Sequence, residues 1–299
     1  MTDAAIGPEI SVGLPVAGNN VGQFEAAVRS VFAQTFGDWE LVILLDGVSD
    51  QLSERAHQID DSRIVILTHT VSGGLAKGLN EITTTARSPL LARLDGDDIM
   101  APTRLERQTA YLRAHPEVDV LASRAITIDD RTVIRGILPE DPIPTNQAGF
   151  LKSHCSSHPT VMRRTEWSKN HPYDPRYLRG EDKELWFRSQ PTTTYAKLNE
   201  PLMFYRVGRN PNPTKQRLSA EYDRMLLREV GPQFVGRFGT LRRVADSMTR
   251  QLIYSVAVAI GQGSLLYSRH HEPLAEETHA AVTEALALAS SAKVPGWDR

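Results

Sequence analysis

The first half of this 299-residue chain alternates short apolar runs with segments of helical periodicity. The apolar runs are Ile10–Leu14, Leu41–Leu45, Ile64–Leu67, Leu90–Leu94 and Val118–Ala122. Between the first two runs, five apolar residues share one helix face: Phe24, Ala27, Val28, Val31 and Phe32. This alternation predicts an α/β fold, with a mixed, mostly parallel sheet flanked by helices.

Two more helices and a strand pair are expected further along. One helix follows Gly74, where apolar residues recur at helical spacing, and another spans residues 102–114. Segments 125–129 and 132–138 then flank two polar residues, as the strands of a hairpin do. Prolines and glycines at 208–213 mark a boundary, so we expect a main unit over 1–212 and a C-terminal helical extension over 213–299.

Composition narrows the class of protein. Lys and Arg number 34 against 36 Asp and Glu, and this balance of 34 − 36 = −2 gives no electrostatic reason to expect a nucleic-acid partner. The single cysteine, Cys155, excludes an internal disulfide and cysteine-based zinc sites. The first residues lack a signal-peptide pattern, and the apolar-leaning stretch 252–267 is interrupted and shorter than the ~20 residues of a membrane span. A cytoplasmic location is therefore expected.

Carboxylates follow two of the predicted strands. Asp46 comes after the second apolar run, and Asp95, Asp97 and Asp98 come after the fourth. Three neighbouring aspartates repel one another unless a cation or hydrogen-bond donors offset their charge, and Mg²⁺ and Mn²⁺ take such oxygens together with those of a diphosphate. Gly96 allows the sharp turn that would let two carboxylates face a ligand. The alternative is a solvated acidic turn that caps the next helix.

Two further segments have residue types suited to ligand binding. Gly73 and Gly74, with Lys77 one turn later, offer backbone N–H groups and a positive helix end to phosphate. The chain has neither a Walker loop nor a Gly-x-Gly-x-x-Gly pattern after its first strand, which removes most support for kinases, P-loop NTPases and Rossmann dehydrogenases. Glu181 and Asp182 begin a predicted helix, where they act either as helix-capping acids or as a general base.

The motifs, taken in order, resemble those of glycosyltransferase family 2, the inverting GT-A enzymes that use nucleotide-diphospho-sugars. In the first half, the matching segments are residues 10–16, 34–43, 46–50, 73–80 and 94–98. The second half is more specific, and its matching segments are residues 157–164, 173–177, 180–188 and 200–207.

The resemblance assigns roles to individual residues. It places the nucleotide-sugar, a UDP-sugar first and a dTDP- or GDP-sugar otherwise, in about 9–125, and a glycan, lipid-linked or small-molecule acceptor in about 126–212. The nucleotide-sugar would contact Pro15, Val16, Asp46, Ser49, Gly74, Lys77, Asn80, Arg93, Asp95 and Gly96. Asp97 and Asp95 would hold Mn²⁺ or Mg²⁺, and Asp182, beside Glu181, would be the general base. On the acceptor or diphosphate side, the resemblance places His158, Arg206 and Trp186, although the helical position of Trp186 favours a core residue.

One departure and two alternative functions follow. Where many members carry a histidine after the last core strand, this chain has Gly208, so His158, Arg206 or the metal with Lys77 would take over that role. A sugar-nucleotide nucleotidyltransferase is an alternative, although residues 13–18 lack the basic side chains of its usual loop. A non-catalytic nucleotide-sugar-binding protein is the other.

The sequence of the C-terminal extension is compatible with more than one partner. Arg242, Arg243 and Arg250 precede the apolar run 252–266. This pattern is typical of an interfacial helix at the inner face of a membrane. It also fits a helix that packs on the main unit or on a second copy in a homodimer, which we favour.

Overall fold

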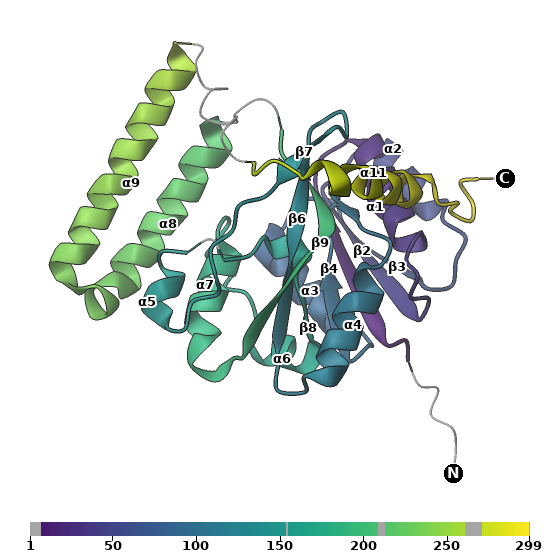
Figure 1. Cartoon of the computed structure of the whole chain (residues 1–299), viewed down its shortest axis with the longest axis horizontal. Helices are drawn as coiled ribbons and strands as arrows, with labels where there is room; N and C mark the ends of the chain where they lie inside the picture. Colours follow the sequence, from purple (N-terminus) through teal and green to yellow (C-terminus); the bar gives the residue numbers. More distant parts are fainter. Residues whose placement is uncertain (1–6, 154, 209–212, 261–270, 299) are drawn as a thin grey trace.

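The computed structural model describes residues 7–153, 155–208, 213–260 and 271–298. Its centre is one mixed sheet in the order β3-β2-β1-β4-β8-β6-β9-β5, with β7 paired to β6 (Figure 1). The strands are β1 (Ile10–Val16), β2 (Trp39–Asp46), β3 (Ile64–His69), β4 (Leu90–Arg93), β5 (Ile99–Met100), β6 (Val120–Ile128), β7 (Ile134–Ile137), β8 (Met162–Arg164) and β9 (Tyr195–Arg206).

Helices cover both faces of the sheet. They are α1 (Val21–Phe32), α2 (Asp50–His57), α3 (Leu75–Thr85), α4 (Arg104–Ala114), α5 (Gln147–Phe150), α6 (Thr165–Asn170), α7 (Glu181–Ser189), α8 (Pro213–Phe234), α9 (Gly236–Ala259) and α11 (Glu276–Ser291). Apolar residues of α1, α2 and α4 pack in one core cluster, and those of α3, α6 and α7 pack in another. β1 and β2 are buried along their whole length and consist mostly of apolar residues, as expected for central parallel strands.

The predicted α/β fold is confirmed, and each of the five apolar runs contributes to a strand. Two details of the prediction were wrong. Segments 118–122 and 125–129 were expected to be separate, but they form the single strand β6, which pairs with β9 along its length through register shifts near Arg124. The helix expected from Pro102 begins at Arg104, two residues later.

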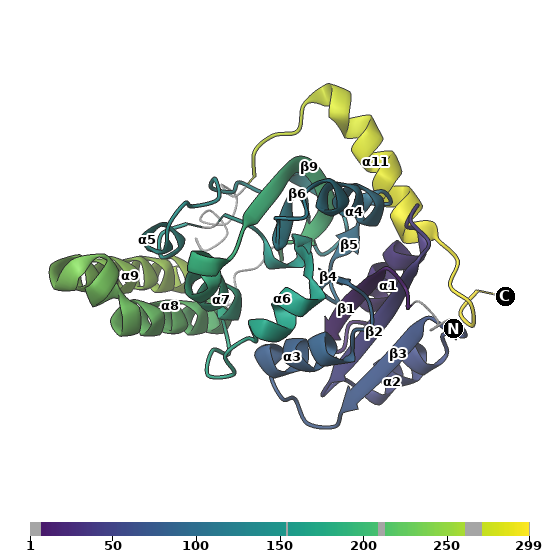
Figure 2. The ribbon, with the colours of Figure 1, turned by 90° about the horizontal axis from the view of Figure 1, so that it is seen from below.

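The C-terminal extension divides into two parts that lie on opposite sides of the main unit (Figures 1 and 2). The α8–α9 hairpin projects on one side, while α11 packs on α1. Beyond α11, the Trp297 ring lies 5.9 Å from that of Phe24, and Asp298 forms a 2.6 Å ion pair with Arg29. The predicted boundary at 212 falls at residues 209–212, which lie outside the described residues, and part of the apolar run 252–266 does too.

No helix within the described ranges combines the length and the apolar character that crossing a bilayer demands.

Candidate active site

A cavity of about 420 Å³ lies at the carboxyl ends of β1, β2 and β4, and we call it the strand-end cavity. The carboxyl ends of parallel strands are where α/β proteins bind ligands. Seven of the ten residues predicted to contact the nucleotide-sugar line it: Pro15, Val16, Asp46, Gly74, Arg93, Asp95 and Gly96. The sequence pattern thus brings separate motifs to one place.

The other three predicted contacts lie elsewhere. The hydroxyl of Ser49 caps α2 and accepts a bond from the Leu52 amide. The Asn80 side chain bonds both backbone groups of Tyr173, at 2.8 and 2.9 Å, so it ties α3 to the 173 loop. Lys77 is exposed on α3 and is not among the residues that line the cavity. Their contact with a nucleotide-sugar stays a prediction.

Asp46 orders the loop that follows β3. Its carboxylate accepts hydrogen bonds from the Ser72 hydroxyl at 2.6 Å and from the amides of Gly73 and Gly74 at 2.7 and 3.2 Å. Burial alone would raise the pKa of Asp46, but these bonds, with that of His69, lower it. The two glycine amides that the sequence offers to phosphate therefore already bind a carboxylate.

Asp95, Asp97 and Asp98 form an acidic cluster in which one oxygen from each lies within 4.8 Å of the others. Asp98 is buried; its Oδ1 accepts a 2.7 Å bond from the Arg206 amide, whereas its Oδ2 has no hydrogen-bond partner among the described residues. Burial, followed by the charge of Asp95, raises the pKa of Asp97, and burial with both neighbouring charges raises that of Asp98 well above its usual value.

These residues fit a hard divalent cation. A cation would offset the mutual repulsion that raises the two pKa values, and an all-oxygen donor set is what Mg²⁺ and Mn²⁺ prefer. Arg206 also stabilises the backbone at the cluster, because its guanidinium donates to the backbone oxygens of Asp97 and Asp129 at 2.7 and 2.6 Å. Arg206 is therefore a supporting residue of the cluster.

A buried arginine links the strand-end cavity to α7. Arg93 forms a 2.8 Å ion pair with Asp95, lies 3.8 Å from Glu181 and donates to the ring of His158. The His158 ring in turn lies 3.4 Å from Glu181 and 3.9 Å from Asp182. The donor-side aspartate and the predicted base thus belong to one network.

His158, Glu181 and Asp182 also have their ligand atoms within 4.8 Å of one another. The guanidinium of Arg93 already supplies positive charge there, so this group fits an ion-pair network better than a second metal site. Burial and the charge of Asp182 raise the pKa of Glu181 to about 7. Glu181 is 5% exposed and does not line the strand-end cavity, so its contacts lie within the protein.

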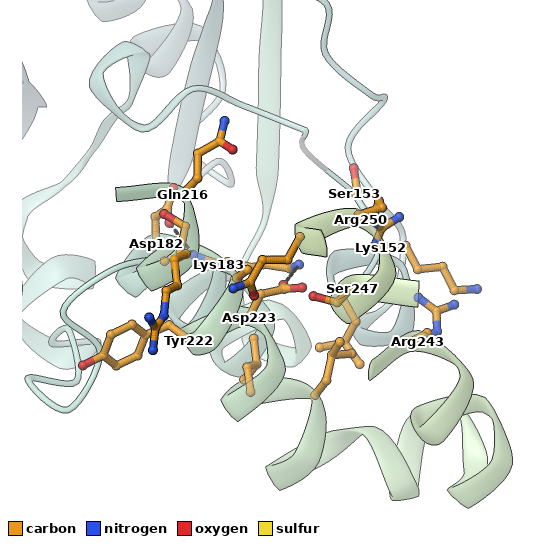
Figure 3. Close-up of a pocket in the computed structure, with 18 of the residues that line it drawn as sticks. Lys152, Ser153, Asp182, Lys183, Gln216, Tyr222, Asp223, Arg243, Ser247 and Arg250 are labelled. Carbon is orange, nitrogen blue, oxygen red and sulfur yellow. Dashed lines mark hydrogen bonds and ion pairs between the residues drawn. The ribbon is translucent and has the colours of Figure 1, made fainter. Parts of the chain in front are cut away.

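Asp182 lines a second cavity of about 1050 Å³, which we call the helix-side cavity (Figure 3). It lies between α7, α8, α9 and residues 150–153 and 155–156. Trp186 lines it as well and is 4% exposed, so this side chain belongs both to the core and to the cavity wall.

At two points of the chain, consecutive residues line different cavities. Arg179 and Lys215 line the strand-end cavity, while Gly180 and Gln216 line the helix-side cavity. Sequence reasoning missed both basic residues. Arg179 directly precedes the Gly180 motif and was open to prediction, whereas Lys215 comes from the start of α8, whose placement no local pattern indicates.

Comparison with known proteins identifies the family. Residues 16–171 match glycosyl transferase family 2. The chain belongs to glycosyltransferase family 2. An uncharacterized glycosyltransferase of Methanocaldococcus jannaschii is 27% identical over 69% of this chain and 73% of its own length. The putative glycosyltransferase EpsE of Bacillus subtilis is 31% identical over 61% of this chain and 66% of its own length.

The solved structures confirm the fold. TarS of S. aureus, determined in complex with UDP-GlcNAc, has a TM-score of 0.54 at 15% identity over 94% of this chain and 81% of its own. The predicted GT-A fold is therefore confirmed, and this family 2 chain is a glycosyltransferase.

Proposed function

We propose that this glycosyltransferase is inverting and metal-dependent, and that it moves a sugar from a nucleotide-diphospho-sugar to an acceptor hydroxyl. One observation carries the proposal. Asp182, which lines the helix-side cavity, lies 3.9 Å from the His158 ring, and Arg93 links that ring to Asp95 of the acidic cluster at the strand-end cavity. A carboxylate in that position can receive the acceptor proton while the sugar leaves the diphosphate.

The donor occupies the strand-end cavity in this proposal. The family supports a nucleotide-sugar, and the UDP-GlcNAc complex of TarS supports a UDP-sugar ahead of dTDP- and GDP-sugars. Asp97 and Asp95 would hold Mn²⁺ or Mg²⁺, which supplies positive charge to the leaving diphosphate. Arg93 fixes Asp95 through their ion pair, and the guanidinium of Arg206 fixes the backbone at Asp97.

Inversion follows from a single displacement. The acceptor oxygen forms a bond to the anomeric carbon as the bond from that carbon to the diphosphate oxygen breaks. The acceptor proton passes to the carboxylate of Asp182, and the nucleoside diphosphate leaves with the electron pair. Glu181 and His158 act as positioning residues, since they contact Asp182 or Arg93 within the protein. The acceptor is a glycan, a lipid-linked sugar or a small molecule.

A donor panel tests this function. In the presence of Mn²⁺, one among UDP-GlcNAc, UDP-Glc, dTDP-Glc and GDP-Man is expected to raise the melting temperature. Saturation at 100 times Kd adds about 2.7 kcal/mol, or about 5 °C. With an acceptor panel, the bound donor should then release a nucleoside diphosphate, and NMR of the product should show an inverted anomeric centre.

Three outcomes contradict the proposal. Pyrophosphate release from a nucleoside triphosphate and a sugar phosphate would make the protein a nucleotidyltransferase. Donor binding without consumption across a broad acceptor panel would make it a non-catalytic binding protein. Retention of the anomeric configuration would exclude a single-displacement mechanism.

We also propose that α9 contacts an anionic membrane surface. Its outward face carries exposed apolar side chains at helical spacing: Phe238, Leu241, Met248, Leu252 and Val256. The same helix has four arginines and one acid, Asp246, and this net positive charge would attract anionic lipids. In this proposal, the protein works at the inner face of the membrane.

Vesicle co-sedimentation tests the membrane contact. The chain should sediment with phosphatidylcholine vesicles that contain phosphatidylglycerol, and L241E with L252E should reduce the bound fraction at least about tenfold. Leu288, 55% exposed on α11, gives the matched control L288E, which should not change binding. Absence of vesicle binding, together with a dimeric mass by light scattering that L241E with L252E abolishes, would assign this face to a homodimer.

A further inference from the structure

The helix-side cavity is lined by more positive than negative side chains. Its described lining has five basic residues and two acids, Asp182 and Asp223. The basic residues are Lys152, Lys183, Arg217, Arg243 and Arg250. The whole chain has a net charge of −2, so this excess is a local property of the cavity.

Two of the five basic side chains are neutralised by neighbours. Lys183 pairs with Asp223 across α7 and α8, and Arg217 pairs with Glu221 at 2.9 Å along α8. Lys152, Arg243 and Arg250 form no ion pair with a carboxylate of the described residues. Figure 3 shows these three side chains together, on the side of the cavity away from Asp182.

Two buried polar atoms of residues that line this cavity also lack hydrogen-bond partners. The hydroxyl of Ser153 and the indole N–H of Trp186 are buried and have no hydrogen bond within the described part of the chain. A buried polar group without a partner costs about 1–3 kcal/mol, so such groups indicate that a ligand or water completes them. Ser153 lies next to Lys152, at the cationic side of the cavity.

We propose that the helix-side cavity binds the acceptor and that Lys152, Arg243 and Arg250 bind a phosphate or diphosphate group on it. The inference rests on the proposed function, which places the acceptor hydroxyl at Asp182. Guanidinium and ammonium groups recognise phosphate through charge-assisted hydrogen bonds. An acceptor that spans the cavity would present its hydroxyl to Asp182 and its phosphate to the three cations, while the indole of Trp186 lies along the wall.

The volume suits such a molecule. A cavity of about 1050 Å³ is at the upper end of the range for small-molecule sites, and it accommodates a sugar with a diphosphate. Ile253 and Tyr254 of α9 line the same cavity beside Arg250, so an apolar chain on the phosphate could continue toward the outward face of α9. The phosphate could thus belong either to a lipid headgroup or to a soluble sugar phosphate.

Calorimetric titration of the full chain in EDTA tests the inference, because EDTA removes the cation that the strand-end cavity is proposed to need. The probes are inorganic pyrophosphate and farnesyl diphosphate. Each of K152Q, R243Q and R250Q should weaken binding about 10- to 100-fold, as expected for the loss of a charged hydrogen bond. Arg242 is on the same helix and paired to Asp246, so R242Q is the matched control and should leave affinity unchanged.

The two probes also identify the source of the phosphate. Farnesyl diphosphate binding at least tenfold tighter than pyrophosphate supports a lipid-linked acceptor, whereas equal affinities support a soluble one. Thermal denaturation of each variant confirms that it is folded.

Two results would overturn the inference. One is pyrophosphate binding that the triple variant K152Q/R243Q/R250Q leaves unchanged. The other is binding that is lost in K215Q and not in the triple variant, since Lys215 lines the strand-end cavity and the probe would then sit there. In either case, a donor-induced rise in melting temperature with Mn²⁺ would leave the proposed function standing, so the two failures are distinguishable.

Discussion

Replacing Asp182 with asparagine is expected to lower kcat by about 10²- to 10⁴-fold, the range found for loss of a general base. The side chain keeps its size, but it can no longer accept the acceptor proton. Donor affinity should change little, because Asp182 lines the helix-side cavity and not the strand-end cavity. Turnover is measured as nucleoside diphosphate release at saturating metal, and donor affinity by calorimetry.

The control for this experiment is D223N. Asp223 is the other carboxylate that lines the helix-side cavity, and it is paired with Lys183. If D223N loses as much turnover as D182N, the loss reflects cavity charge and not proton transfer. Unchanged turnover in D182N removes Asp182 from the base role, and a loss confined to donor affinity makes it a binding residue.

Removing the divalent cation is expected to abolish transfer, and D97N should reduce kcat/KM about 10³-fold, which corresponds to about 4 kcal/mol of transition-state stabilisation. The side chain of Asp97 reaches the surface, although the surrounding protein still desolvates its carboxylate, so it can contact a diphosphate in the strand-end cavity. Activity is measured before and after EDTA treatment and again after Mn²⁺ is added back.

Asp50 provides the control. It follows Asp46 closely in the sequence and lies in the first turn of α2, but it does not line the strand-end cavity. D50N should keep full activity and full recovery by Mn²⁺. Transfer that persists in EDTA would eliminate the metal role of Asp97, as would a D97N enzyme with unchanged kcat/KM. These outcomes concern the cation alone and leave Asp182 to be judged separately.

The sequence predicts the parts of this molecule whose structure is decided locally. A strand buried on both faces favours a continuous apolar run, and Leu41–Leu45 within β2 is one. Because carboxyl ends of parallel strands meet at one sheet edge, the positions of Asp46 and Asp95 in the sequence place both at the strand-end cavity.

Other features depend on contacts between distant segments. Arg93 and His158 are 65 residues apart, and nothing in either segment predicts that their side chains meet. Residues 150–153 and 155–156, α7 and the α8–α9 hairpin form the walls of the helix-side cavity, so its basic residues cannot be grouped before the fold is known. The prediction of two separate strands in place of β6 was wrong for a similar reason, because pairing with β9 keeps the strand continuous past Arg124.

Trp297 packs on α1 and α2, so the order of synthesis decides when these two helices become covered. The indole N–H of Trp297 donates to the backbone oxygen of Arg55 at 2.8 Å, across a separation of 242 residues. At about 5–20 residues per second, the ribosome makes Trp297 roughly 12 to 50 s after Arg55. The strands and helices of the first half therefore emerge early, but α1 and α2 stay uncovered until translation has reached Trp297 and its neighbours.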